Sequence, residues 1–293
     1  MNKIIVVTGP TAVGKTKLSI ELAKKYNGEI INADAVQVYK GLDIGSAKVT
    51  KEEMENIPHY LLDIKSVEEE YNIYEYQKDC RMIISEIISR GKTPILVGGT
   101  GLYIKAALYD YKLSKEKENN TYEDLSTEEL YKELIKIDKN INIDKNNRRR
   151  IIRAINYYKE NNKSISENKT DKLLYNAIFI GLTTDRENLY NKINDRVDIM
   201  IRDGLLDEVK SFYDKGIRTK PLLSAIGYKE LYDYYDNKVS FETAIDNIKK
   251  NSRHYAKRQY TFFNHQLPVI WFETDYNNFN NTIKKVSSYI DNN

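Results

Sequence analysis

A glycine-rich segment near the start of the chain restricts the possible folds more than any other feature. Gly9-Pro10-Thr11-Ala12-Val13-Gly14-Lys15-Thr16 fits the pattern G-x-x-x-x-G-K-[ST]. It lies between an apolar, strand-like run at residues 3–8 and an amphipathic, helix-like run at residues 17–26. In that setting the backbone N–H groups and the positive end of the helix surround a phosphate, Lys15 adds a point charge, and Thr16 is a ligand for a phosphate-bound Mg²⁺. We therefore predict a phosphate site, with an ordinary strand-to-helix turn as the weaker alternative.

Strand-like and helix-like runs alternate along much of the chain. The strand-like runs are residues 3–8, 29–33, 59–64, 94–97, 176–182 and 268–272. Helix-like runs such as 17–26, 73–90 and 102–109 separate them. This alternation predicts an α/β fold, with a P-loop core of parallel sheet flanked by helices.

The middle of the chain interrupts the alternation. Residues 112–175 are polar and helical in pattern, without a convincing strand, so we expect a helical insertion domain there. The core domain then consists of residues 1–111 and 176–293. Its second part is expected to contain helices at 186–213, 241–251 and 253–263 before a last strand near Trp271.

Composition excludes several classes of protein. A single cysteine, Cys80, excludes a disulfide framework, and the chain starts directly with a strand pattern instead of a signal-like leader, so we expect a reducing, cytoplasmic location. No run approaches the about 18 apolar residues that a membrane span needs. The three histidines are scattered, which argues against a metal cluster. The net charge of +3 indicates no polyanionic partner by itself.

The loop pattern leaves the identity of the phosphate ligand open. P-loop nucleotide hydrolases hold their metal with an acid at the end of another buried strand. Here the run 94–97 ends in Gly98-Gly99-Thr100-Gly101, without a carboxylate, although Asp63 closes the expected strand 59–64 and remains a candidate. The sequence therefore favours diphosphate binding without motor-type hydrolysis.

Asp34 follows the expected second strand, at the edge where ligands of parallel sheets bind. A carboxylate beside a diphosphate is electrostatically unfavourable unless it binds a metal or accepts a proton. The alternative is a structural Asx turn or helix cap. Residues 35–48 mix amide, aromatic and basic groups, which suits an unstacked base better than a small sugar.

Two basic clusters complete the candidate features. Arg148, Arg149, Arg150 and Arg153 lie on a probable helix, where Arg149 and Arg153 share a face. The second cluster comprises Lys249, Lys250, Arg253, His254, Lys257 and Arg258, interleaved with Tyr255. Such groups neutralise nucleic-acid phosphates and stack on bases, but each run is equally compatible with a solvated helix face, and the aromatic residues with a core.

Several segments, taken together and in order, resemble the bacterial tRNA dimethylallyltransferases. These are the P-loop, residues 32–48, Gly98-Gly99-Thr100-Gly101-Leu102-Tyr103, residues 149–153, 204–209 and 225–228, and Ser252-Arg253-His254-Tyr255-Ala256-Lys257-Arg258-Gln259. Two departures stand out: Ala35-Val36 replaces the family's usual Ser-Met, and Phe262 stands where Trp is frequent. The chain also lacks the Cys/His zinc module of the longer eukaryotic relatives, so no structural metal is expected.

The resemblance implies a specific reaction. A dimethylallyl group would pass from its diphosphate to N6 of the adenosine 3′ to the anticodon, in tRNAs that read codons beginning with U. It also implies a mobile helical insertion and a channel that donor and adenine enter from opposite ends. The partners would be the tRNA anticodon stem-loop and dimethylallyl diphosphate, with Mg²⁺ as cofactor, and a monomer is our expectation.

The resemblance also implies roles for individual residues. Asp34 corresponds to the general base, Thr100 to a contact of the leaving diphosphate, and Arg196 to a second diphosphate contact beside the P-loop. The tRNA contacts would be Asp34, Ala35, Val36, Gln37, Thr100, Arg149, Arg150, Ile151, Ile152, Arg153, Ala225, Ile226, Gly227, Tyr228 and Lys229. Two other functions remain open, a P-loop nucleotide or small-molecule kinase and an RNA-binding protein whose P-loop is only a ligand sensor.

Overall fold

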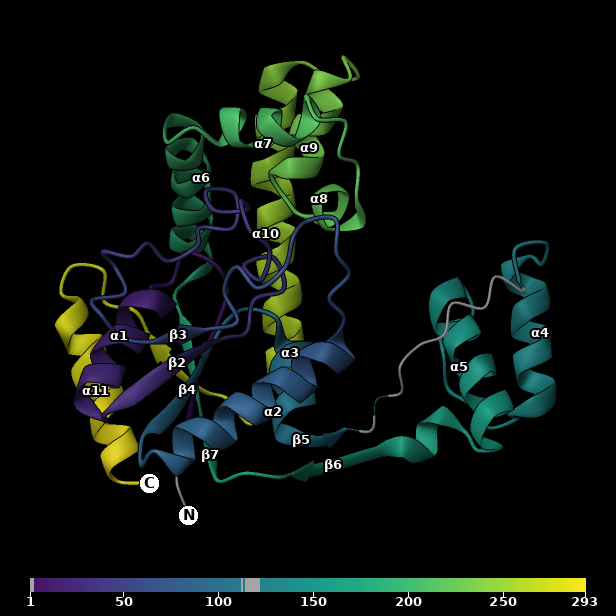
Figure 1. Ribbon diagram of the computed structural model, residues 1–293, viewed down its shortest axis with the longest axis horizontal. Coiled ribbons are helices and arrows are strands. Elements are labelled where there is room, and N and C mark those ends of the chain that lie inside the picture. Colours follow the sequence, from purple (N-terminus) through teal and green to yellow (C-terminus); the bar gives the residue numbers. More distant parts are fainter. Residues whose placement is uncertain (1–2, 112, 114–121) are drawn as a thin grey trace. The chain divides into compact units, whose positions relative to one another are not determined.

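The chain folds into two compact units. The computed structural model describes residues 3–111, 113 and 122–293. The first unit consists of Met1–Ala107 and Tyr175–Asn293, and the second of Leu108–Leu174 (Figure 1).

A parallel sheet of six strands forms the centre of the first unit. The strand order is β3-β2-β4-β1-β7-β8, and every neighbouring pair is parallel. The strands are β1 (Ile4–Thr8), β2 (Gly28–Asn32), β3 (His59–Tyr60), β4 (Thr93–Val97), β7 (Ala177–Thr183) and β8 (Ile270–Glu273). All residues of β1 are buried, as expected for a central strand covered on both faces. The predicted α/β class is confirmed.

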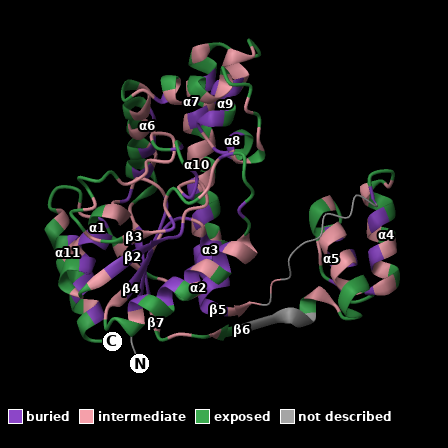
Figure 2. Cartoon of the chain, viewed as in Figure 1, coloured by how far each residue is buried: buried purple, intermediate pink, exposed green. Residues whose placement is uncertain are grey.

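Helices cover both faces of this sheet (Figure 1). They are α1 (Lys15–Lys25), α2 (Ile73–Ser89), α3 (Gly101–Leu108) and α11 (Phe279–Asp291). Helix α1 packs on α11 and on the sheet, and α2 packs on β2 and β4. The buried residues in Figure 2 concentrate between these layers, where Val7, Leu18, Ile95 and Ile180 belong to one apolar cluster. Because the strands are parallel, the segments that follow β1, β2 and β4 begin at the same edge of the sheet.

The helices after β7 differ in length from those expected. They are α6 (Arg186–Arg202), α7 (Leu205–Tyr213), α8 (Lys220–Ser224), α9 (Tyr228–Tyr235) and α10 (Phe241–Gln266). The single helix expected at 186–213 is wrong, because Gly204 adopts φ 102° and ends α6 there. The two helices expected at 241–251 and 253–263 are one continuous helix, α10, since no glycine or proline interrupts this stretch.

Strand β3 is also shorter than expected. The predicted run 59–64 is a strand only at His59–Tyr60. Leu61 and Asp63 then adopt φ 61° and 53°, and these left-handed conformations turn the chain away from the sheet. Asp63 therefore does not close a strand, contrary to the sequence prediction.

The second unit contains two packed helices and a short ribbon. Its elements are β5 (Tyr109–Tyr111), α4 (Thr127–Ile137), α5 (Arg148–Asn161), the 3₁₀ helix η1 (Ile165–Asn168) and β6 (Lys169–Leu173). Leu130 and Leu134 of α4 pack with Ile151 and Ile155 of α5 in a separate apolar core. The expectation that residues 112–175 lack a strand is wrong, because β6 pairs antiparallel with β5. Its polar sequence shows no apolar alternation, so the pairing was not predictable from the pattern.

Among residues 3–111, 113 and 122–293, no helix has both the length and the apolar character that crossing a membrane requires.

Candidate active site

The loop after β1 has the backbone geometry of a phosphate cradle. Gly9, Ala12 and Gly14 adopt φ values of 135°, 68° and 89°, and such positive-φ residues let successive backbone N–H groups converge on an anion. Glycine is required at two of these positions for a second reason. A Cβ on Gly9 would lie 2.4 Å from the Leu182 carbonyl oxygen, and one on Gly14 would lie 2.7 Å from the Phe279 ring. Helix α1 then begins at Lys15 with no acidic residue in its first turn, so its positive end is available to an anion.

Two cations meet at this loop. Lys15 Nζ donates a hydrogen bond to the Pro10 carbonyl oxygen (2.7 Å), and Arg196 Nη1 donates one to Thr11 Oγ1 (3.1 Å). Burial, reinforced by the Arg196 charge, lowers the pKa of Lys15 to about 7, whereas Asp34 acts in the opposite direction. Burial likewise lowers the pKa of Arg196. Asp34 opposes the shift at both cations and Glu53 opposes it at Arg196, but burial prevails, so an anionic ligand would stabilise the site.

Asp34 begins the turn that follows β2. Its backbone N–H donates to Asn32 Oδ1 (2.9 Å), and its own Oδ1 accepts from the Val36 N–H (2.9 Å), which is an Asx turn. Asp34 Oδ2 has no hydrogen-bond partner in the described part of the chain. The side chain can therefore cap the turn with one oxygen and offer the other oxygen to a ligand.

The glycine-rich segment after β4 brings Thr100 to Asp34. Thr100 Oγ1 accepts a hydrogen bond from the Ala35 N–H (3.0 Å), and the Thr100 N–H donates to the Ala33 carbonyl oxygen (3.0 Å). A Cβ on Gly98 would lie 2.2 Å from that same carbonyl oxygen, so only glycine allows the two segments to approach this closely. The two predicted catalytic residues thus share one edge of the sheet.

Two residues of helix α10, Gln259 and Tyr255, also contact this part of the site. Gln259 Nε2 donates to the Gly99 carbonyl oxygen (3.0 Å). Burial and the charge of Asp34 raise the pKa of Tyr255, while a hydrogen bond with Thr100 opposes the shift. The sequence assigned no role to Gln259 and left Tyr255 between core and base-stacking functions. In the sequence, both residues were marked only by lying in the segment 252–259, which resembles the family.

The candidate acid Asp63 serves a different purpose. Its Oδ1 accepts a hydrogen bond from Lys48 Nζ (2.5 Å), which also binds Asp43 Oδ1 (2.6 Å). Among residues 3–111, 113 and 122–293, no three His, Cys, Asp or Glu side chains form a group that could hold a metal ion. Cys80 is buried, and burial raises the pKa of its thiol to about 12, as expected for a structural cysteine.

The residues predicted to contact tRNA fall in different environments. In the second unit, Arg149 and Arg150 are exposed on α5, Arg153 and Ile152 are half-buried, and Ile151 belongs to the core of that unit. In the first unit, Lys229 is exposed and Ile226 half-buried, whereas Ala225, Gly227 and Tyr228 are buried.

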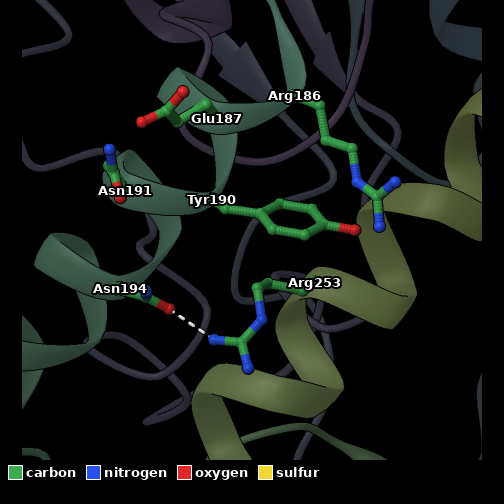
Figure 3. A pocket seen from close by; sticks show the side chains of 6 residues that line it. All are labelled: Arg186, Glu187, Tyr190, Asn191, Asn194 and Arg253. Carbon is green, nitrogen blue, oxygen red and sulfur yellow. Dashed lines mark hydrogen bonds between the residues drawn. The ribbon is translucent and has the colours of Figure 1, made fainter.

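Arg253 of the second basic cluster lines an open pocket of about 570 Å³ between α6 and α10, together with five residues of α6 (Figure 3). Arg253 Nη1 donates to Asn194 Oδ1 (2.6 Å), and the guanidinium groups of Arg186 and Arg253 lie 5.1 and 5.8 Å from the centre of the Tyr190 ring. Elsewhere in the cluster, Lys249 pairs with Asp198 (2.6 Å). The sequence did not single out Arg186, Tyr190 or Asn194, because their grouping with Arg253 arises only when α6 packs on α10.

Fold and site together define a P-loop α/β protein whose phosphate cradle adjoins a carboxylate and a threonine. The chain belongs to the IPP transferase family, whose model matches residues 37–266. A tRNA dimethylallyltransferase of Anoxybacillus flavithermus is 50% identical over 299 aligned residues, which cover 99% of this chain and 96% of the relative. One from Geobacillus kaustophilus is 48% identical over 302, covering 98% and 96%.

Solved structures give the same result. A tRNA isopentenylpyrophosphate transferase from Bacillus halodurans is 42% identical, with a TM-score of 0.78, and the match covers 100% of this chain and 96% of that one. A eukaryotic dimethylallyltransferase acting on tRNA is 30% identical, with a TM-score of 0.87, and the match covers 100% and 80%. The family resemblance seen in the sequence is confirmed.

Proposed function

We propose that this chain transfers a dimethylallyl group from dimethylallyl diphosphate to N6 of the adenosine 3′ to the anticodon, in tRNAs that read codons beginning with U. The chain is a tRNA-prenylating enzyme of the IPP transferase family. The observation that carries the proposal is the pairing of a cationic cradle with a carboxylate. Lys15 belongs to the P-loop, Arg196 donates a hydrogen bond to Thr11 of the same loop, and Asp34 lies close enough to influence the pKa of both cations.

At the donor end, the diphosphate would occupy the loop between Gly9 and Thr16. Its charge compensates the two desolvated cations, whose depressed pKa values reflect the unfavourable burial of positive charge. As the bond from the allylic carbon to oxygen breaks, negative charge grows on the leaving diphosphate. Lys15, Arg196 and the backbone N–H groups of the loop are fixed in position to stabilise that charge.

At the acceptor end, Asp34 would act as the general base. The exocyclic amine of adenine is a weak nucleophile because its lone pair is delocalised into the ring. The nitrogen becomes acidic only as it bonds to the allylic carbon, so a carboxylate in hydrogen-bonding reach can accept its proton. Asp34 Oδ2 has no other partner in the described part of the chain, and Thr100 fixes the turn by accepting from Ala35 N–H.

The proposal includes a Mg²⁺ ion that the donor would bring with it. Among the described residues no three His, Cys, Asp or Glu side chains form a group that could hold a metal ion, so in this proposal the phosphates would supply most of the ligands. Thr16, at the start of α1, is the protein ligand in this proposal. The ion would neutralise charge on the diphosphate.

Acceptor binding would extend beyond the catalytic pair. We assign the exposed Arg149 and Arg150 of α5 to phosphates of the tRNA anticodon stem-loop.

The proposal also includes action as a monomer, since the P-loop, Asp34, Thr100 and Arg196 come from one compact unit of one chain. A tRNA acceptor and a single buried cysteine support a cytoplasmic location.

The proposal is tested by incubating the protein with labelled dimethylallyl diphosphate, Mg²⁺ and unmodified tRNA. The RNA is then digested to nucleosides. We expect N6-dimethylallyladenosine from the position next to the anticodon. Transfer of labelled phosphate from ATP to a small acceptor would instead support a kinase, and binding of tRNA without any turnover would support an RNA-binding protein.

A further inference from the structure

We propose that Glu208 is a positioning residue for the acceptor end of the site, acting through Gln37. This inference rests on the proposed function. Glu208 lies on α7, in the segment 204–209 that contributed to the family resemblance but received no role. It is remote in sequence from Asp34 and is brought to the acceptor segment only by the fold.

The Glu208 carboxylate receives four hydrogen bonds. Oε2 accepts from the N–H groups of Asp43 (3.1 Å) and Ile44 (2.8 Å). Oε1 accepts from the Gly45 N–H (3.1 Å) and from the hydroxyl of Tyr228. Successive backbone N–H groups directed at one point form an anion-binding concavity, and here a carboxylate of the same chain fills it. Hydrogen bonds to an ionised acceptor are the stronger kind.

The arrangement is built on the core of the first unit. Tyr228 is fully buried, and burial, together with the Glu208 charge, raises the pKa of its phenol, which keeps it a hydrogen-bond donor. Its ring lies 2.4 Å from the position that a Cβ on Gly45 would occupy, so only glycine fits there. The family resemblance placed Tyr228 among the tRNA contacts. Its burial favours a different role, which is to stabilise the turn at residues 43–45.

The turn that Glu208 stabilises also orients the side chain of Gln37. Gln37 Nε2 donates to the carbonyl oxygens of Ser46 (3.1 Å) and Ala47 (3.3 Å). Both neighbours are acceptors, so they fix which end of the amide faces them. Gln37 Oε1 has no hydrogen-bond partner in the described part of the chain, and it is therefore presented as an acceptor three residues from Asp34.

This orientation matters for substrate binding. If the turn at residues 43–47 loosens, the amide of Gln37 loses the carbonyl groups that orient it, while the P-loop keeps all its own contacts. Loss of Glu208 function should thus impair use of tRNA and leave use of dimethylallyl diphosphate intact. A residue that only stabilised the fold would impair both.

The test is a double-mutant cycle on the full-length enzyme with Glu208→Gln and Gln37→Ala. The Gln side chain keeps the length of Glu208 but loses the charge and half of the acceptor capacity. We expect Glu208→Gln to raise the KM for tRNA about tenfold, as for loss of charge-assisted hydrogen bonds. The KM for dimethylallyl diphosphate should stay within about twofold. In the Gln37→Ala background, Glu208→Gln should add almost nothing.

The control is Asp207→Asn, which removes a neighbouring, exposed carboxylate of the same helix and should leave both constants unchanged. Additive effects of Glu208→Gln and Gln37→Ala, or equal rises in both Michaelis constants, would overturn the proposal. If Glu208→Gln proves too unstable to assay, Gly45→Ala tests the same turn through the Tyr228 contact and should show the same selective effect on tRNA. A wild-type enzyme that fails to prenylate tRNA would refute the proposed function instead.

Discussion

The donor and acceptor ends of the site are built in different ways. The donor end is local in sequence: residues 9–16 form the cradle by their own backbone conformation, and Lys15 binds the Pro10 carbonyl oxygen of the same loop. The acceptor segment, residues 34–48, depends on distant residues, since Thr100 holds Ala35 and Glu208 holds residues 43–45. A binding loop formed by consecutive residues can be recognised from its sequence pattern. A site formed by residues that are distant in sequence can be recognised only when the fold is known. The two ends should also fail separately when mutated.

The largest effect is expected at Asp34, where chemistry can be separated from binding. Asp34→Asn retains an oxygen to accept from the Val36 N–H, so the Asx turn survives, but the amide cannot take up a proton. We expect the single-turnover rate to fall by roughly 10²- to 10⁴-fold. The affinity for tRNA in filter binding should stay within a few-fold. Near wild-type prenylation by this variant would reduce Asp34 to a structural cap.

Lys15→Ala should damage the donor end alone. It removes a charge that faces the diphosphate, and we expect the KM for dimethylallyl diphosphate to rise by about 10- to 100-fold. Thermal stability should be unchanged or slightly higher, because the lost group is a desolvated cation. Lys24→Ala, at an exposed ion pair on the same helix, is the matched control. A normal KM for the donor would contradict the cradle assignment.

The pH dependence of donor binding follows from the pKa of Lys15, which is about 7 in the ligand-free protein. An anionic donor favours the protonated lysine, so above pH 7 binding requires proton uptake. Affinity should fall by up to about tenfold per pH unit there. Calorimetry at pH 8.5, in two buffers of different ionisation enthalpy, measures the uptake. We expect nearly one proton for the wild type and none for Lys15→Ala; equal uptake by both would assign the proton to another group.

Folding stability responds to the same group with a defined sign. The unfolded state keeps the pKa of Lys15 near 10.5, above its folded value. Between these values the unfolded chain binds more protons, so Lys15 makes the free energy of unfolding of the ligand-free protein increase with pH.

The smallest effect is expected from the exposed arginines of α5. Arg149→Ala combined with Arg150→Ala should weaken tRNA binding a few-fold at low salt. The slope of log affinity against log salt should flatten by about one to two units, since fewer counterions are released. Lys136→Ala with Lys139→Ala removes two exposed charges of the same unit as a control. An unchanged slope would return Arg149 and Arg150 to a solvated helix face.

The sequence predicted the parts of the molecule that depend on short-range patterns. The α/β class and the family followed from apolar runs and ordered motifs, and the structure and the comparisons confirm both. The sequence patterns did not predict three features: the break at Gly204, the continuity of α10 and the β5–β6 ribbon. The first depends on one backbone conformation and the last on a partner distant in sequence.

The same division holds for the site. Asp34 and Thr100 were chosen by motif, and the structure links them through the Ala35 N–H. The supporting residues Glu208 and Gln259 had no signal beyond their segments, because an acidic or amide side chain on an amphipathic helix is usually solvated. Their hydrogen bonds to residues 43–45 and Gly99 exist only after α7 and α10 pack.

One set of steady-state measurements tests the separation of the two ends most directly. The Michaelis constants for dimethylallyl diphosphate and for tRNA are determined for the wild type, Lys15→Ala and Glu208→Gln. We predict a crossed pattern, in which Lys15→Ala raises only the constant for the diphosphate and Glu208→Gln raises only the constant for tRNA. If either variant raises both constants to a similar extent, the donor and acceptor ends are not independent and the separation proposed for them is contradicted.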